Sequence, residues 1–195
     1  MEGNKFSLSK DQLQSFTNNV FAVAITLLVL NFTVPALQES NIALIDFLSG
    51  LWPQFLGYII SFFIIASFFV SLHDFLNRLN YINSRIFWVT MIKFFFIVLV
   101  PFSTLLMTEY GHLQIANLFF DINILVIGFL FIIDSYFVEE GMIKDGQTKI
   151  SKRIWRESLI PVSAMLAIIL TFISPKNSQY AFLILLLPLI TRLKG

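Results

Sequence analysis

The chain has 195 residues, of which 57% are hydrophobic and only 13% are charged, and its formal net charge is +1. An ordinary soluble domain carries about 25% charged residues, so this composition argues against a water-soluble globule. A near-neutral charge offers no basic surface for nucleic acid, and the lack of cysteine removes disulfides, thiolate nucleophiles and cysteine metal sites. The sequence predicts a single domain, residues 1–195, embedded in a lipid bilayer.

Six apolar windows follow one another along the chain, with lengths suited to a hydrocarbon core about 30 Å thick. They cover residues 12–34, 51–72, 85–107, 113–138, 155–173 and 179–193, and the last is the shortest. Strands of a membrane barrel alternate polar and apolar residues, whereas these windows are continuously apolar. They predict an all-α fold, a bundle of six transmembrane helices.

The distribution of Lys and Arg predicts how this bundle is oriented. Eleven of the 13 basic residues fall in the amino-terminal segment, the second and fourth loops and the carboxyl-terminal end. The loops on the other side, the first of which covers about 35–50, hold only Lys176, and Lys93 lies inside the third window. Because basic loops remain in the cytoplasm, both termini are expected to be cytoplasmic.

Ionisable residues inside the windows are the next candidates for function, since such groups are costly in a membrane. Lys93 either extends back to the cytoplasmic headgroups, which the sequence favours, or pairs with Asp134. Asp121 is expected to contact interfacial water, and His73 closes the second helix. No motif for nucleophilic, metal or phosphate chemistry accompanies them, so the chain is not expected to be an enzyme or to hold a cofactor.

The first window differs from the others in combining a polar entrance, small residues and a hydroxyl in mid-helix. At helical spacing a stripe forms beside Thr26; it consists of Phe16, Asn19 or Val20, Val23, Leu27 and Leu30. Such stripes in membranes are usually packing faces, and the Thr26 hydroxyl would then bond back to the carbonyl of residue 22. Spacing alone favours a packing face over a pore lining.

Residues 16–30, Phe-Thr-Asn-Asn-Val-Phe-Ala-Val-Ala-Ile-Thr-Leu-Leu-Val-Leu, resemble the first-helix signature of the transmembrane protein 175 family. These are endolysosomal and bacterial potassium channels without a carbonyl-lined filter. His73 and the run Leu-Val-Pro-Phe-Ser-Thr at 99–104 are secondary matches. The resemblance implies a homotetramer in a bacterial plasma membrane, with the first helix of each subunit lining a central pore.

The resemblance also implies roles for particular residues. Val23, Leu27 and Leu30 match the apolar pore constriction of the family, and Thr26 matches the threonine one turn outward, which contributes to ion selectivity. Potassium would be the permeant ion. Without a carbonyl cage, selection would depend on pore width and on the lower cost of dehydrating potassium, with Thr26 hydroxyls partly replacing water.

The chain departs from the family motif at its charged positions. Gln12 stands where the family has an arginine. In the Phe-Ser-Asp triplet the phenylalanine is kept as Phe16, the serine is Thr17 and the aspartate is Asn18. Losing one charge would leave the other unpaired, whereas losing both preserves the possibility of a neutral hydrogen bond. We therefore hypothesise a motif network in which Gln12 and Asn18 keep the contact, together with His73.

The resemblance implies a potassium-selective, leak-like channel subunit. Two alternatives remain open from the sequence. A secondary transporter would require broken helices at paired positions and ionisable groups at the midplane, of which Lys93 is one candidate. A membrane scaffold that has kept the fold but lost conduction is compatible with the altered triplet.

Overall fold

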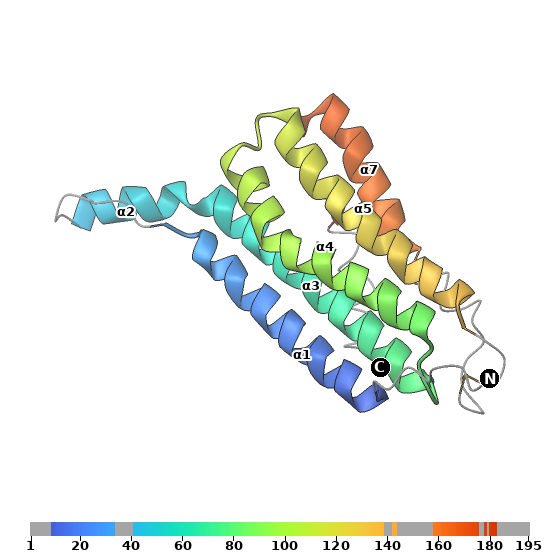
Figure 1. Ribbon diagram of the computed structural model, residues 1–195. Helices are drawn as coiled ribbons and strands as arrows, with labels where there is room; N and C mark the ends of the chain where they lie inside the picture. The colour runs from blue at the N-terminus through green and yellow to red at the C-terminus, as the bar shows by residue number, and fades with distance from the viewer. Residues whose placement is uncertain are drawn as a thin grey trace, which may run out of the picture.

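The computed structural model describes residues 9–33, 41–138, 142–143, 158–175, 178 and 180–182, and their regular structure is helical (Figure 1). The helices are α1 (Lys10–Leu27, continued by a 3₁₀ segment, Leu28–Asn31), α2 (Asn41–Gly50), α3 (Trp52–Arg78), α4 (Ser84–Glu109), α5 (Gln114–Tyr136) and α7 (Leu159–Ile173). α1, α3, α4 and α5 form a bundle, and α7 packs against α5. The predicted all-α class is confirmed.

Four of these helices are long and apolar enough to cross a membrane: Lys10–Asn31, Trp52–Arg78, Ser84–Glu109 and Gln114–Tyr136. They correspond to the first four predicted windows. The fifth window contains α7, which has 15 residues and is therefore shorter than a full span. The sixth window, 179–193, lies outside the described residues except for 180–182.

The first predicted loop differs from the structure, because α2 occupies Asn41–Gly50 within it. This helix runs almost directly into α3. The Leu51 amide donates to the Phe47 carbonyl at 3.2 Å, and the Phe55 amide donates to the Leu51 carbonyl at 2.9 Å. Pro53, in the first turn of α3, has no amide hydrogen to continue the ladder. The chain bends there and begins a new helix.

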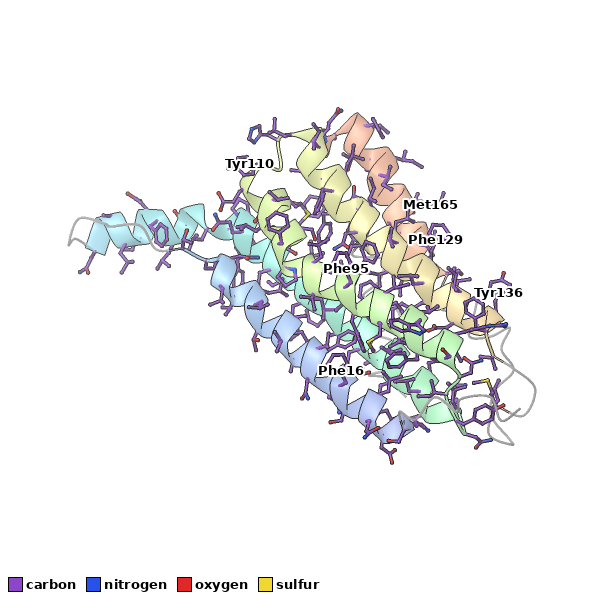
Figure 2. The ribbon with its side chains drawn as sticks, in the orientation of Figure 1. Phe16, Phe95, Tyr110, Phe129, Tyr136 and Met165 are labelled. Atoms are coloured by element: carbon purple, nitrogen blue, oxygen red, sulfur yellow. The ribbon has the colours of Figure 1, made fainter. Side chains whose placement is uncertain are left out.

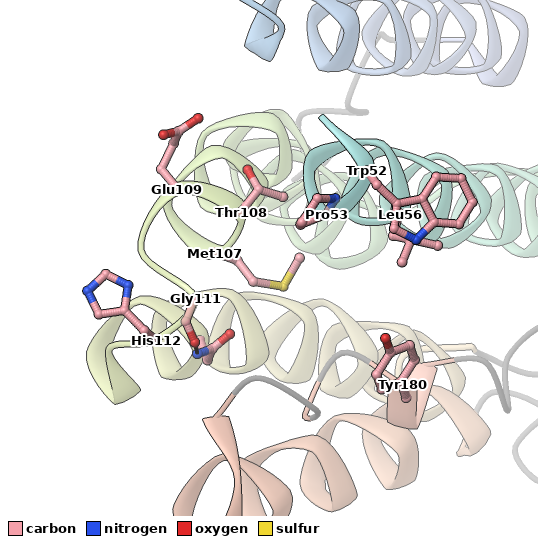
Figure 3. A pocket seen from close by; sticks show the side chains of 10 residues that line it. Trp52, Pro53, Leu56, Met107, Thr108, Glu109, Gly111, His112 and Tyr180 are labelled. Carbon is pink, nitrogen blue, oxygen red and sulfur yellow. Dashed lines mark hydrogen bonds between the residues drawn. The ribbon is translucent and has the colours of Figure 1, made fainter. Parts of the chain in front are cut away.

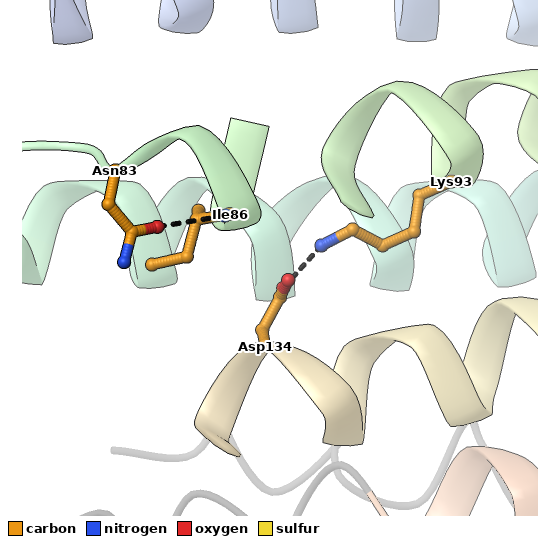
Figure 4. Close-up of polar contacts among 4 residues, drawn as sticks. All are labelled: Asn83, Ile86, Lys93 and Asp134. Carbon is orange, nitrogen blue, oxygen red and sulfur yellow. Dashed lines mark hydrogen bonds and ion pairs between the residues drawn. The ribbon is translucent and has the colours of Figure 1, made fainter. Parts of the chain in front are cut away.

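Side-chain caps fix two of the helix starts. The Ser9 hydroxyl accepts from the Gln12 amide while the Gln12 side chain accepts from the Ser9 amide, a reciprocal capping box for α1. The Asn83 side chain accepts from the Ile86 amide at 2.9 Å and caps α4 (Figure 4). Both caps agree with the boundaries at which the predicted helices begin.

The interior is closely packed between α3, α4, α5 and α7. Phe68 of α3 stacks on Phe131 of α5 with ring centroids 5.6 Å apart. Gly128 lets α7 approach α5, since a Cβ at this position would lie 2.9 Å from Pro161 Cδ. The outer surface, in contrast, carries large apolar side chains such as Phe95, exposed on α4 (Figure 2). An apolar exterior of this kind is what a bilayer requires.

Candidate pore-lining face of the first helix

One side of α1 is held against α3 and α4. Its buried positions recur at helical spacing and are Leu13, Thr17, Phe21, Ala24 and, in the 3₁₀ segment, Leu28. This spacing of four, four, three and four residues selects one stripe of the helix. The side of α1 opposite to this stripe is therefore exposed, and it touches α4 at its border, where Phe16 meets Phe94.

The free side of α1 contains most of the residues predicted for the pore. The exposed residues of this side include Gln12, Phe16, Asn19, Val23, Thr26 and Leu30, together with Ser15 and Ala22. Val23 is 51% exposed and Leu30 is 69% exposed. Leu27 is half-buried and lies at the edge of this face. Of the predicted constriction, Val23 and Leu30 thus share the free face with Thr26, whereas Leu27 only borders it.

The Thr26 hydroxyl points along the helix surface in a defined direction. It donates to the Val23 carbonyl at 2.9 Å, one residue further along than the expected carbonyl of residue 22. Because the hydroxyl hydrogen is used in this bond, the oxygen can offer its lone pairs on the exposed side. Such an oxygen is suited to accept a hydrogen bond from water or to contact a cation.

An aromatic cluster fixes the rotation of α1 against its neighbours. Phe16 meets Phe94 of α4 edge to face at 5.5 Å, and Phe21 meets Phe69 of α3 at 5.4 Å. Phe69 in turn stacks on His73, with ring centroids 5.7 Å apart. Edge-to-face ring pairs have preferred geometry, so this cluster holds the face containing Val23 outward. It also joins two residues of the proposed motif network, Phe16 and His73.

Two of the remaining members of the motif network, Gln12 and Thr17, bond to other groups within one chain. Gln12 is engaged with Ser9 in the capping box, and the buried Thr17 hydroxyl donates to the Leu13 carbonyl at 2.7 Å. Asn18 is exposed. Within the described residues, Gln12 makes no hydrogen bond to Asn18 or to His73. A contact between them remains a prediction for assembled subunits.

Polar contacts anchor α1 at both ends. The Lys10 ammonium donates to the Leu79 carbonyl at 2.8 Å, at the end of α3. At the opposite end, the Asn31 amide donates to the Pro101 carbonyl of α4 at 3.0 Å. Pro101 lies inside α4, where its ring provides no amide hydrogen for the helix, and its carbonyl is used here by a neighbouring segment. The helix with the free face is therefore fixed along its length.

The side chain of Lys93 does not take the direction toward the headgroups that the sequence favoured. It is instead fully buried in an ion pair with Asp134 of α5 (Figure 4). The Lys93 nitrogen also lies 4.7 Å from the ring centre of Phe131, a cation–π distance. The alternative interpretation, pairing with Asp134, is confirmed.

Asp121 also differs from expectation, because it is buried rather than in contact with interfacial water. It accepts a hydrogen bond from the Thr171 hydroxyl of α7 at 2.8 Å. Nearby in sequence, the Asn123 amide donates to the Ser103 hydroxyl of α4 at 3.3 Å. These bonds join helices, and in the part of the chain that the structure describes no three His, Asp or Glu side chains are grouped to hold a metal ion.

A cavity of about 620 Å³ opens at the end of the bundle where α3 begins and α4 ends (Figure 3). Trp52 and Tyr180 contribute aromatic rings to it, and Glu109 and His112 lie on its other side. Glu109 accepts a hydrogen bond from Gln54 at 2.6 Å. Trp and Tyr gather where a membrane protein leaves the hydrocarbon, so this end of the bundle lies at a membrane surface.

Residues 12–101 match the model of a family described as the endosomal/lysosomal potassium channel TMEM175. A potassium channel of Chamaesiphon minutus is 32% identical over 100 residues, 51% of this chain and 49% of that protein. A potassium channel of Streptomyces collinus is 27% identical over 99 residues, 51% of this chain and 48% of that protein. The chain thus spans about half the length of the curated relatives it matches.

The fold comparison extends further along the chain. The crystal structure of a lysosomal potassium-selective channel TMEM175 homolog from Chamaesiphon minutus superimposes with a TM-score of 0.81 and 25% identity. The match covers 94% of this chain and 97% of that one. The resemblance to the transmembrane protein 175 family is therefore confirmed, over residues 12–101 by sequence and over nearly the whole chain by fold.

Proposed function

We propose that this chain is the subunit of a potassium-selective, leak-like channel in a bacterial plasma membrane. The observation that carries the proposal is the fold shared with a potassium-selective channel over 94% of the chain. The matched relatives are likewise named as potassium channels. These names describe channels, which supports the expectation that the chain is not an enzyme.

The free face of α1 supports this proposal on physical grounds. It exposes the polar side chains of Gln12, Asn19 and Thr26 along a helix that is long enough to span the bilayer. Gln12 and Thr26 each make one bond within their own helix, but their remaining hydrogen-bonding groups, and those of Asn19, would be unsatisfied in hydrocarbon, which costs several kcal/mol. We therefore infer that this face meets water and other subunits. Four copies of α1 around a common axis satisfy that requirement with closed symmetry.

The mechanism follows from the order of residues on this face. Four copies of Val23 form a narrow apolar ring, with Leu27 bordering it and Leu30 further along. Such a ring excludes water when narrow and opens when side chains rotate. An ion passing it loses most of its hydration shell, which costs less for potassium than for sodium. The outward-facing oxygens of Thr26 replace part of that shell.

The orientation in the membrane rests on the basic residues. Lys10, Arg78 and Arg85 lie at the ends of α1, α3 and α4 that share one end of the bundle, as the contact from Lys10 to the Leu79 carbonyl requires. This end is the cytoplasmic one by the preference of basic residues for that side. The cavity near Trp52 then lies toward the outer surface of the membrane. Potassium would pass through the pore between this surface and the cytoplasm.

Flux from reconstituted vesicles tests the proposal. We expect conductive potassium flux that needs no chemical substrate, that exceeds sodium flux, and that accompanies an assembly of four chains measured by light scattering. Saturable uptake coupled to another solute would instead indicate a transporter. Silent vesicles with intact four-chain assemblies would indicate a non-conducting scaffold.

A further inference from the structure

The exposed side of α4 begins with a positive charge and continues with apolar side chains. Arg85, Trp88, Ile92 and Phe95 are all exposed, and they follow one another at spacings of three and four residues, so they share one side of the helix. From Arg85 to Phe95 the helix rises about 15 Å, which is half of the hydrocarbon thickness. This stripe therefore covers the depth of one leaflet, with Arg85 at the membrane surface.

Aromatic residues indicate that this wall of the bundle meets lipid. On the face formed by α4 and α5, Tyr110 and Tyr136 lie at the two ends, with Phe95 and Phe129 between them (Figure 2). Trp88, which is 59% exposed, lies at the same end of the bundle as Arg85. Trp and Tyr at both ends of an apolar surface are typical of a protein wall in contact with a bilayer. The pattern favours phospholipid over another subunit as the neighbour of this wall.

The guanidinium of Arg85 has a defined position. Its carbon lies 6.0 Å from the ring centre of Phe137, at the end of α5. Asn83 ties that residue to the start of α4, because its side chain accepts from the Ile86 amide and donates to the Phe137 carbonyl at 3.2 Å. Within the described residues the guanidinium forms no ion pair, so its charge is open to a partner from outside the chain.

A guanidinium in this position suits the phosphate of a lipid headgroup. Its rigid fork of N–H donors matches two phosphate oxygens, and anionic lipids of the cytoplasmic leaflet attract basic residues at the membrane surface. Trp88 lies one turn deeper than Arg85, at the level of the glycerol esters, where its indole N–H can donate to an ester carbonyl. Ile92 and Phe95 then lie beside the acyl chains.

We propose that Arg85 and Trp88 form a binding site for an anionic phospholipid of the cytoplasmic leaflet, with one acyl chain along Ile92 and Phe95. The inference rests on the proposed membrane orientation, but it does not require that the assembly conducts. A zwitterionic lipid brings its own positive charge close to Arg85 and binds this site more weakly. The occupant is therefore selected by net charge as well as by its acyl chains.

Quenching of Trp88 fluorescence by brominated lipids tests the proposal. The chain has three tryptophans, and the changes Trp52→Phe and Trp155→Phe leave Trp88 alone. This protein is reconstituted in phosphatidylcholine vesicles in which a fixed fraction of the lipid carries brominated acyl chains, either as phosphatidylglycerol or as phosphatidylcholine. Because bromine quenches only tryptophan that it contacts, quenching measures which lipid occupies the site. Brominated phosphatidylglycerol should bind about five-fold more strongly, the factor expected for one basic residue at the membrane surface.

Variants of Arg85 connect this preference to one side chain. Arg85→Gln should bring the ratio of the two affinities close to one, while quenching by brominated phosphatidylcholine stays the same. Arg85→Lys keeps the charge but not the fork of donors, so it should keep only part of the preference. The matched control is Arg78→Gln, at the same end of the bundle on α3, and it should leave the preference unchanged.

The outcomes separate this inference from the proposed function. Equal quenching by the two brominated lipids with Arg85 present would refute the anionic site, as would a preference that survives Arg85→Gln. The absence of quenching by either lipid would show that another subunit covers Trp88. Inorganic phosphate should not reduce the preference, and a loss on its addition would indicate a site for a free anion instead. Potassium flux is measured in the same vesicles, so that flux without lipid preference refutes the lipid site alone, and preference in silent vesicles refutes the channel alone.

Discussion

The ammonium of Lys93 donates a hydrogen bond to the carboxylate of Asp134 in the interior of the bundle, where both side chains are fully buried. The pair joins α4 to α5 toward the cytoplasmic end proposed above. The ring of Phe131 covers one side of the ammonium. Because an isolated charge is costly in the membrane, each group depends on the other for its burial.

Removing one member of this pair should destabilise the protein strongly. Lys93→Met or Asp134→Asn leaves a buried charge uncompensated, and a loss of about 3–5 kcal/mol is expected. The double variant Lys93→Met with Asp134→Leu leaves no charge and should recover most of that loss. The unfolding midpoint of each purified variant in detergent checks the prediction. A double variant as unstable as either single one would contradict it.

Lys93 also shows what the sequence leaves undecided. Its position inside the third window and the presence of Asp134 in the fourth suggest pairing, and hydropathy marks both helices. Whether the ammonium extends to the headgroups or turns inward depends on which side of α4 faces α5, however. The rotation of α4 about its axis is fixed by packing against residues distant in sequence, such as Phe131. The spacing of residues along the sequence does not reveal this rotation.

The first helix was predicted more completely than its surroundings. A 3.6-residue period brings Val23, Thr26 and Leu30 onto one face, as the structure has them, while Leu27 turns toward its edge. α2 escaped prediction because its 10 residues are too few for a span and because Gly50 suggests a break. The helix nevertheless continues to Leu51 through backbone bonds that hydropathy does not detect.

The contact between α5 and α7 should tolerate no added atom at Gly128. A Cβ there would lie 2.9 Å from Pro161 Cδ and 3.0 Å from its nitrogen, and the proline ring is rigid. Gly128→Ala is therefore expected to lower stability by about 1–3 kcal/mol. Gly50→Ala is the matched control, since its Cβ meets nothing within 4 Å and helix propensity improves. Thermal unfolding that ranks the two variants the other way would contradict this packing.

The width of the pore should depend on Val23. Val23→Ala widens the proposed ring, so that ions keep more of their water and the cost of dehydration discriminates less. The ratio of potassium to sodium permeability, taken from reversal potentials, should fall. Val162→Ala on α7 is a matched control, because Val162 is 50% exposed, close to the 51% of Val23, but lies on another helix. Equal reversal potentials for both variants and the unmodified chain would remove Val23 from the pore.

Thr26 should contribute through its hydroxyl rather than its size. Thr26→Val keeps the shape but removes the oxygen that the bond to the Val23 carbonyl turns outward, so selectivity for potassium should decrease. Thr26→Ser retains the oxygen and should keep more of that selectivity. The two variants are compared by reversal potentials in mixed potassium and sodium solutions. If valine and serine behave alike, the hydroxyl plays no part in selection.

The neutral residues at positions 12 and 18 should be matched to each other across the assembly. Gln12→Arg places a positive charge on the free face of α1 in every subunit, where like charges repel. Adding Asn18→Asp supplies compensating carboxylates, so the single variant should form fewer four-chain assemblies than the double one, measured by light scattering after chromatography. Both variants lose the capping bond from the Ser9 amide equally, so the difference in assembly between them isolates the effect of the charge.

The control variant is Gln114→Arg, at an exposed position on α5, which should leave assembly unchanged. Equal assembly of the single and double variants would contradict the pairing of Gln12 with Asn18.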